Sequence, residues 1–356
     1  MAGATLTAWD GFSLPGRKAL ALGYGLLLAV LVAGGIAIAF FGRVPGGRLD
    51  LPPPPTVQPI RHTSLTPPPV TAPGQLPPVL TTGPITKPVY AGRALLADPA
   101  LIENTADGPL PRIGNDGRKP MLAYAVPAAA GKMRIAIVIG GLGISAEKTA
   151  QALAGLPPGV TLGFLPYAGD VQRWVGEARR LGHEVLLEVP MEPFDFPDSD
   201  PGPHTLRSGL GEESNTDRLT WALTRFTGYV GVTNLLGGRF LSDPDSLSPV
   251  MTFLTRRGLL FFDDGTAAQS AGPDVALRTG APFARANQNI DSIQSAAEID
   301  RHLSSLEDEA RASGSAIGSG YLYPVTVQRV AAWARGLSGR GFVLVPISAM
   351  MDGQKK

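Results

Sequence analysis

The chain has no cysteine among its 356 residues. Disulfides and thiolate-bound metals are therefore excluded, and the redox compartment stays undecided because cysteine usage is its usual indicator. Histidine is also scarce, with His62, His183, His204 and His302 as the full set. Of these, only His204 falls in a loop after a predicted strand, from which it could reach a site.

An excess of charge of either sign is also lacking, since 31 basic and 30 acidic residues leave a formal net charge of +1. Nucleic-acid binding requires a clustered basic face, and no such cluster is present in the sequence. We therefore expect no nucleic-acid partner.

Charge is absent altogether from residues 19–42, a run of 24 residues rich in Leu, Ala and Val. At about 1.5 Å per residue, such a helix spans the ~30 Å hydrocarbon core of a membrane. A buried core helix or a cleaved signal peptide are the alternatives, but the apolar part of a signal peptide is usually shorter. The run predicts a single-pass anchor in the inner (cell) membrane, preceded by a tail at 1–18. Arg17 and Lys18 favour a cytoplasmic N-terminus, whereas Arg43 and Arg48 weigh against it.

Proline is concentrated in residues 43–130, which hold 19 of the 34 prolines. This composition cannot bury enough apolar surface to fold, so it predicts a disordered and extended linker. A spacer and a ligand for a proline-recognition domain are both compatible with it. Short ordered pieces could occur at 91–98 and 122–130.

Residues 131–351 have the composition of a globular α/β domain in which short apolar strands alternate with helical patterns. The first strand, 134–139, is aliphatic without alternation, as in a parallel sheet covered on both faces. It ends at Gly140 and Gly141, and Ser145 is placed to cap a helix predicted at 146–156. A longer helix is predicted at 295–313, where Ser295 and Glu298 have the spacing of a capping box. We expect an irregular (β/α) barrel of seven or eight strands, with its site at the carboxyl ends of the strands. The further strands are expected at 160–165, 183–189, 229–234, 259–263, 282–285, 315–318 and 342–346.

Several motifs of this domain occur in the order of a known family: GHEVLL (182–187), PMEP (190–193), DPGP (200–203), GYVGV (228–232) and LVPIS (344–348). Over residues 133–350 the chain resembles the divergent polysaccharide deacetylases. The resemblance implies a distorted (β/α) barrel related to metal-dependent sugar N- or O-deacetylases. In such enzymes a divalent metal polarises the acetyl carbonyl and activates a water.

The chain departs from this family at the metal-binding positions. The family's Asp-Asp pair is replaced by Gly140 and Gly141, and a histidine ligand by Leu235. Its late Gly-His-Pro motif aligns with Gly320-Tyr321-Leu322, so Tyr321 takes the place of the other histidine. Glycine and leucine offer no donor, and tyrosine is a poor ligand at neutral pH. We therefore expect no metal or other cofactor, and zinc or another divalent metal only if the site is rearranged.

An acidic and polar set remains at the predicted strand ends. Paired carboxylates can perform general acid/base chemistry when their environments separate their pKa values. The candidate catalytic residues are Glu188, Asp263 and Asp264, and the candidate substrate-binding residues are Glu192, Asn234, Arg239 and Tyr321. Alternatively, Glu192 and Arg239 form an ion pair that fixes loops, and 195–200 is a solvated loop. Phe194, Phe196, Tyr321 and Tyr323 could stack on sugar rings or pack in the core.

Two functions from different classes follow. The first is a membrane-anchored protein of the cell envelope, with its C-terminal domain in the periplasm or outside, that has a degenerate metal site and binds a glycan or an envelope protein. The second is an active carbohydrate deacetylase or hydrolase with a rearranged acidic centre. A scaffold in a wall-associated complex, positioned by the long spacer, is a third possibility.

Overall fold

The computed structural model describes residues 97–354. The predicted tail, the predicted membrane anchor at 19–42, the linker up to residue 96 and His62 lie outside these residues. Within 97–354, no helix is both long enough and apolar enough to cross a membrane.

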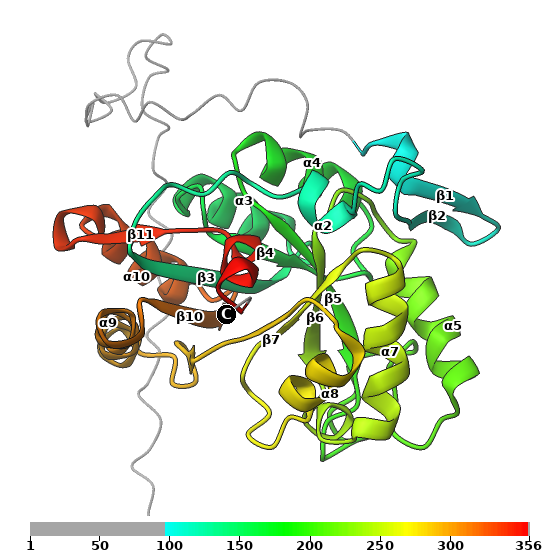
Figure 1. Cartoon of the computed structure of the whole chain (residues 1–356). Helices are drawn as coiled ribbons and strands as arrows, with labels where there is room; N and C mark the ends of the chain where they lie inside the picture. Colours follow the sequence, from blue (N-terminus) through cyan, green and yellow to red (C-terminus); the bar gives the residue numbers. More distant parts are fainter. Residues whose placement is uncertain (1–96, 355–356) are drawn as a thin grey trace, which may run out of the picture. The chain divides into compact units, whose positions relative to one another are not determined.

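One long, curled sheet of parallel strands forms the centre of the domain (Figure 1). The strand order is β8-β7-β6-β5-β4-β3-β10-β9, and β11 pairs with the beginning of β3. The strands are β3 (Met133–Leu142), β4 (Thr161–Phe164), β5 (Val185–Met191), β6 (Gly231–Leu236), β7 (Leu260–Asp263), β8 (Phe283–Arg285), β9 (Gln288–Asn289), β10 (Ser315–Tyr321) and β11 (Phe342–Leu344).

The two ends of this strand order lie next to each other in the chain, because β8 ends at Arg285 and β9 begins at Gln288. Between them, Ala286 N donates to Asp263 O of β7 at 2.9 Å, and Asn287 N donates to Ile317 O of β10 at 2.8 Å. Consecutive residues thus contact β7 and β10, which are each second from an end of the strand order, so the sheet curls round on itself. The parallel, curled sheet agrees with the predicted (β/α) barrel and with its irregular closure.

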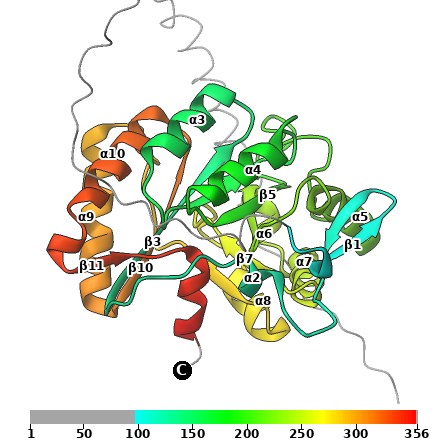
Figure 2. The same ribbon diagram turned by 90° about the horizontal axis from the view of Figure 1, so that it is seen from above.

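Helices surround the outside of the sheet, as the view from above shows (Figure 2). Side chains predicted to cap them do so: Ser145 accepts from Lys148 N and Ser295 from Glu298 N, each at 3.3 Å. The helices are α3 (Ala146–Gly155), α4 (Val171–Arg180), α5 (Glu212–Leu223), α6 (Gly238–Leu241), α7 (Pro244–Arg256), α8 (Gly272–Thr279), α9 (Ala296–Ser313) and α10 (Pro324–Arg335).

Strand alternation divides the buried apolar side chains into two clusters. Along β3, Ile135, Ile137 and Ile139 belong to the larger cluster, which includes the inner faces of the helices. Ala136 and Val138 belong to the smaller cluster inside the curled sheet. Because successive residues of a strand point to opposite faces, residues 136, 138 and 140 share the inner face.

The end of the predicted linker is ordered. Residues 99–124 contain η1 (Pro99–Leu101), an antiparallel hairpin of β1 (Ile102–Thr105) and β2 (Gly108–Pro111), and α2 (Pro120–Ala123). Leu101 and Leu110 are buried. The boundary expected at residue 130 is therefore wrong for this segment, because its few apolar side chains have the domain to pack against.

Two of the motifs that indicated the family meet at the amino end of the barrel. The buried Glu184 carboxylate accepts hydrogen bonds from Ser348 N at 2.9 Å and from Val126 N at 3.2 Å. Ser348 Oγ donates to the same carboxylate at 2.5 Å. Glu184 thus joins the segment before the first barrel strand to the chain after the last one. These motifs stabilise the fold at the end opposite to the strands' carboxyl ends.

Candidate functional site

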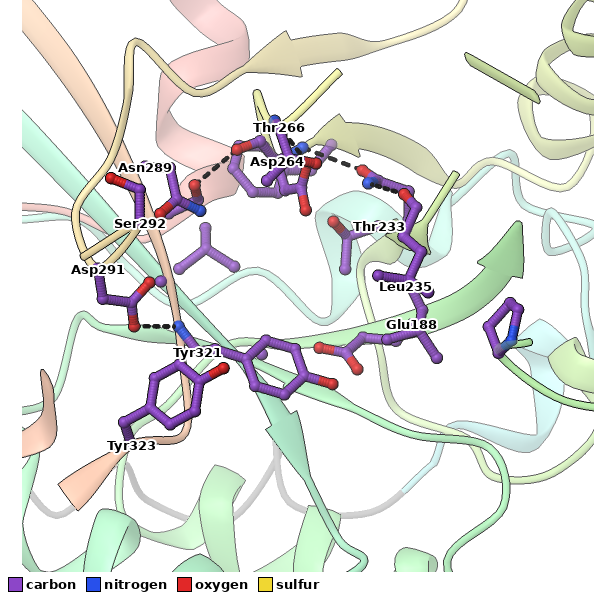
Figure 3. A pocket seen from close by; sticks show the side chains of 18 of the residues that line it. Glu188, Thr233, Leu235, Asp264, Thr266, Asn289, Asp291, Ser292, Tyr321 and Tyr323 are labelled. Carbon is purple, nitrogen blue, oxygen red and sulfur yellow. Dashed lines mark hydrogen bonds between the residues drawn. The ribbon is translucent and has the colours of Figure 1, made fainter. Parts of the chain in front are cut away.

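A cavity of about 500 Å³ opens at the carboxyl ends of the strands. Its size falls in the range of small-ligand sites. Figure 3 shows side chains from β5, β6, β10 and the segments after β7 and β9 converging on it. The polar residues most relevant to its chemistry are Glu188, Thr233, Asp264, Asn289, Asp291 and Tyr321.

Glu188 is the most deeply buried acid of this cavity. Its side chain is 2% exposed, and its Oε1 accepts a hydrogen bond from Gly141 N at 2.7 Å. Its second oxygen, Oε2, is buried and has no hydrogen-bond partner among the described residues. The pKa of Glu188 is raised from its ordinary value of 4.5 to about 8, chiefly by burial; the bond from Gly141 N opposes the rise, and the nearby Asp264 adds to it. The free protein therefore holds this carboxyl largely protonated at neutral pH.

Side chains from other strands occupy the space next to the two glycines after the first barrel strand. A Cβ added to Gly140 would lie 2.1 Å from Glu188 Oε1. A Cβ added to Gly141 would lie 2.5 Å from a Tyr321 ring carbon, and Gly141 has a φ of +87°, which favours glycine. Glu188 of β5 and Tyr321 of β10 thus occupy the space that side chains at positions 140 and 141 of β3 would need.

Asp264 and Asn234 form a second polar group on the wall of the cavity. Asn234 Oδ1 accepts from Asp264 N at 3.0 Å, and its Nδ2 donates to Leu236 O at 2.7 Å. Leu236 has a φ of +58°, a strained conformation for a branched residue that the Asn234 bond helps to hold. Burial raises the pKa of Asp264, although bonds from Thr266 and Asn234 oppose the rise.

Asp291 is a site residue that the sequence analysis missed. It is 5% exposed, and its Oδ2 accepts from Tyr321 N at 2.7 Å and from Thr326 Oγ1 at 2.8 Å. Figure 3 shows the first of these bonds beside the Tyr321 ring, which extends towards Glu188. Burial raises the pKa of Asp291. It follows the two-residue strand β9, too short to leave a pattern in the sequence.

Several candidate site residues from the sequence do not line the cavity. Asp263, the third candidate catalytic residue, does not line the cavity; it is fully buried and lies 3.5 Å from Arg285 Nε. The reason is strand alternation, since Phe262 and Asp264 line the cavity and Asp263 between them points outwards. Glu192 and Arg239 do not line the cavity either; Arg239 Nη1 lies 3.7 Å from Glu192 Oε1.

The loop candidates are also outside the lining. The His204 ring stacks on Trp221 at 3.6 Å between centroids. Phe194 is exposed, and Arg207 lies over the Phe196 ring. Tyr321 and Tyr323 do line the cavity, with their ring centroids 6.0 Å apart.

Three buried polar atoms of the cavity lack a hydrogen-bond partner among the described residues. They are Glu188 Oε2, Thr233 Oγ1 and Asn289 Oδ1. Leaving a buried polar group unpaired costs about 1–3 kcal/mol, so proteins rarely retain several in one place without a use. Their convergence on one cavity makes it the candidate site for a polar ligand.

Among the described residues, the acids of the cavity are not grouped like the ligands of the divalent metal that the family resemblance implies. Two of these acids are engaged by neighbours: Asp291 Oδ2 accepts from Tyr321 N and Thr326 Oγ1, and Asp264 Oδ1 accepts from Thr266 N. Between residues 97 and 354, no three His, Asp or Glu side chains are grouped so that they could hold a metal ion. The side chain of Leu235, which lines the cavity, offers no donor atom.

Comparisons with known proteins agree with this fold. The crystal structure of ATU2773 from Agrobacterium tumefaciens C58 is 44% identical and matches with a TM-score of 0.67, over 68% of this chain and 99% of that one. YibQ of Escherichia coli (strain K12), described as uncharacterized, is 29% identical over 58% of this chain and 64% of its own length, less than two thirds of it. A Haemophilus influenzae protein is 26% identical over 57% of this chain and 72% of its own. The family model of the divergent polysaccharide deacetylases matches residues 137–351. The chain belongs to the divergent polysaccharide deacetylase family.

Proposed function

We propose that this protein binds a carbohydrate in the cavity at the carboxyl ends of its strands, without a catalytic metal. The observation that carries the proposal is the convergence of three unpaired, buried polar atoms on this cavity. A sugar presents hydroxyl groups that both donate and accept hydrogen bonds, so it can satisfy an acid, a hydroxyl and an amide together.

The apolar part of the lining fits the same kind of ligand. Tyr321, Tyr323 and Phe262 line the cavity with Leu235 and Leu236. Aromatic rings present a flat apolar face and, in tyrosine, a polar tip, which suits the mixed C–H and hydroxyl surface of a sugar ring. Membership of a polysaccharide deacetylase family supports the same ligand class.

The replacement of the metal-binding positions argues for binding rather than for the family's hydrolysis. The Glu188 carboxyl and the Tyr321 ring lie close to Gly140 and Gly141, where the family resemblance places a pair of acids. Leu235 offers no donor. An acid that is mostly protonated and a tyrosine phenol can still form hydrogen bonds with a ligand, so the site retains recognition chemistry.

The proposal predicts opposite effects of Thr233→Val on stability and on binding. Removing an unpaired buried hydroxyl is expected to raise the free energy of unfolding by about 1 kcal/mol. Losing its bond to the ligand is expected to weaken carbohydrate binding about three- to tenfold. Urea unfolding measures the first effect, and calorimetry with an oligosaccharide selected on a glycan array measures the second.

Thr161→Val is the matched control. Thr161 is buried outside the cavity, and its Oγ1 accepts from Ile347 N at 3.0 Å. Its replacement should lower stability and leave the affinity unchanged. If no glycan on the array binds the protein, or if Thr233→Val binds the selected one as tightly as the natural chain, the proposed function is wrong.

The same proposal places the carbohydrate-binding domain on the outer side of a membrane, anchored through residues 19–42. The uncharged run of 24 residues and the cationic pair Arg17-Lys18 before it support this orientation. We expect alkaline phosphatase fused after residue 356 to be active in a bacterial host and β-galactosidase at the same point to be inactive. The reverse pattern would place the domain in the cytoplasm, and release into a soluble fraction would contradict the anchor.

A further inference from the structure

The cavity is rich in hydrogen-bond acceptors and in acidic groups. Glu188, Asp264 and Asp291 line it, whereas no Lys, Arg or His side chain of residues 97–354 does. Of the unpaired buried atoms, Asn289 Oδ1 is an acceptor, and Glu188 Oε2 becomes one when a bound cation displaces the carboxyl proton. A ligand that brings donors and positive charge is complementary to this lining.

A primary ammonium group has this chemistry, because it carries three donors, a full positive charge and no acceptor. Bonds between an ammonium and a carboxylate are charge-assisted and stronger than those between neutral groups. Tyr321 and Tyr323 add aromatic faces, which attract cations. The Glu188 carboxyl, with its unpaired oxygen and 2% exposure, is the acceptor best placed to meet the ammonium.

We infer that the cavity recognises an amino sugar through its free ammonium group, so that the preferred glycan carries unacetylated amino groups. This inference rests on the proposed carbohydrate-binding function. An N-acetyl group in the same place would replace the charged donors by one amide N–H and would bring no cation to pair with a carboxylate. The size of the cavity suits a sugar ring with its substituents better than the single alkyl chain of a lysine.

Calorimetry of the full chain with chitooligosaccharides of equal length, one fully N-acetylated and one fully de-N-acetylated, tests the inference. The de-N-acetylated oligomer is expected to bind about tenfold more tightly or better, as one charge-assisted hydrogen bond is gained. Glu188→Gln keeps an acceptor for Gly141 N but cannot form the carboxylate that pairs with the ammonium. It should therefore lower the affinity for the de-N-acetylated oligomer about tenfold, and that for the N-acetylated oligomer by a smaller factor.

Glu184→Gln is the matched control, since Glu184 is equally buried but lies at the opposite end of the barrel. Its affinities should match those of the natural chain. A de-N-acetylated preference that Glu188→Gln removes supports the inference. Equal binding of both oligomers, or tighter binding of the N-acetylated one, overturns it while the proposed carbohydrate function stands.

A lysine oligopeptide of similar charge separates the two sources of an ammonium group. If it binds as tightly as the de-N-acetylated oligomer, the amino-sugar assignment is wrong. If neither oligomer binds while another glycan on the array does, the inference fails and the proposed function survives. If nothing on the array binds, both fail.

Discussion

Gly140→Asp is expected to lower the free energy of unfolding by roughly 3–5 kcal/mol, even though it restores the residue type of the family's metal-binding pattern. The backbone at Gly140 tolerates a side chain, but the space does not, since its Cβ would lie 2.1 Å from Glu188 Oε1. A second buried acid would also have to lie against Glu188 without a cation. Urea unfolding of the variant measures the effect.

The double variant Gly140→Asp with Glu188→Ala tests the cause. Because Glu188 is the side chain in conflict, removing it should recover about 2 kcal/mol or more relative to the sum of the single changes. Gly176→Asp on α4 is the matched control, where an added Cβ meets nothing within 4 Å, and we expect a change within about 0.5 kcal/mol. Additive effects of the two cavity substitutions would show that Glu188 does not occupy this space.

Stability should fall as the pH rises from about 4.5 to about 8, and Glu188→Gln should abolish that part of the decrease. The folded pKa of Glu188 is raised to about 8, whereas its ordinary value is 4.5. Between these values the folded protein retains a proton that the unfolded chain has released. The free energy of unfolding therefore decreases by up to about 1.4 kcal/mol per pH unit. Below about 4.5 both states are protonated, and the contribution of Glu188 is fully present.

The measurement is urea unfolding of the natural chain and of Glu188→Gln at several pH values. The difference between the two isolates Glu188 from the other titrating groups. Glu147→Gln, at an exposed position on α3, is the control, and its curve should run parallel to that of the natural chain. A constant difference between Glu188→Gln and the natural chain from pH 5 to pH 8 would contradict a buried, protonated Glu188.

The order of strands and helices in the domain could be predicted from local sequence patterns. The aliphatic run at 134–139 is part of β3, and the helices predicted at 146–156 and 295–313 agree with α3 and α9 within one residue at each end. The period of the hydrophobic residues and the capping side chains determine such elements, because both act between residues that are close in the chain. The motifs shared with the family then indicated that these strands and helices form a barrel.

Elements whose formation depends on partners far away in the sequence could not be predicted. The hairpin of β1 and β2 was assigned to the linker because β2 contains Pro109 and Pro111. Proline is tolerated there because the sheet has only two strands, so each has a free edge. Strand β9 consists of two residues and is defined by its pairing with β10.

Within the site, the sequence also could not decide which of Asp263 and Asp264 faces the cavity. Strand β7 is apolar on both faces, with Phe261 and Phe262 in succession, so the sequence contains no alternation from which to read the inner face. The fold places Asp264 on the cavity wall and pairs Asp263 with Arg285.

The sequence by itself determined the family, the alternation of strands and helices, and the absence of ligand side chains at Gly140, Gly141 and Leu235, because each is a property of single residues or short segments. Only the tertiary structure decided what takes their place. Glu188 reaches Gly141 N from 47 positions away, and Asp291 reaches Tyr321 N from 30. Such contacts arise when the curled sheet brings the ends of separate strands together, and no local pattern encodes which of their side chains will meet.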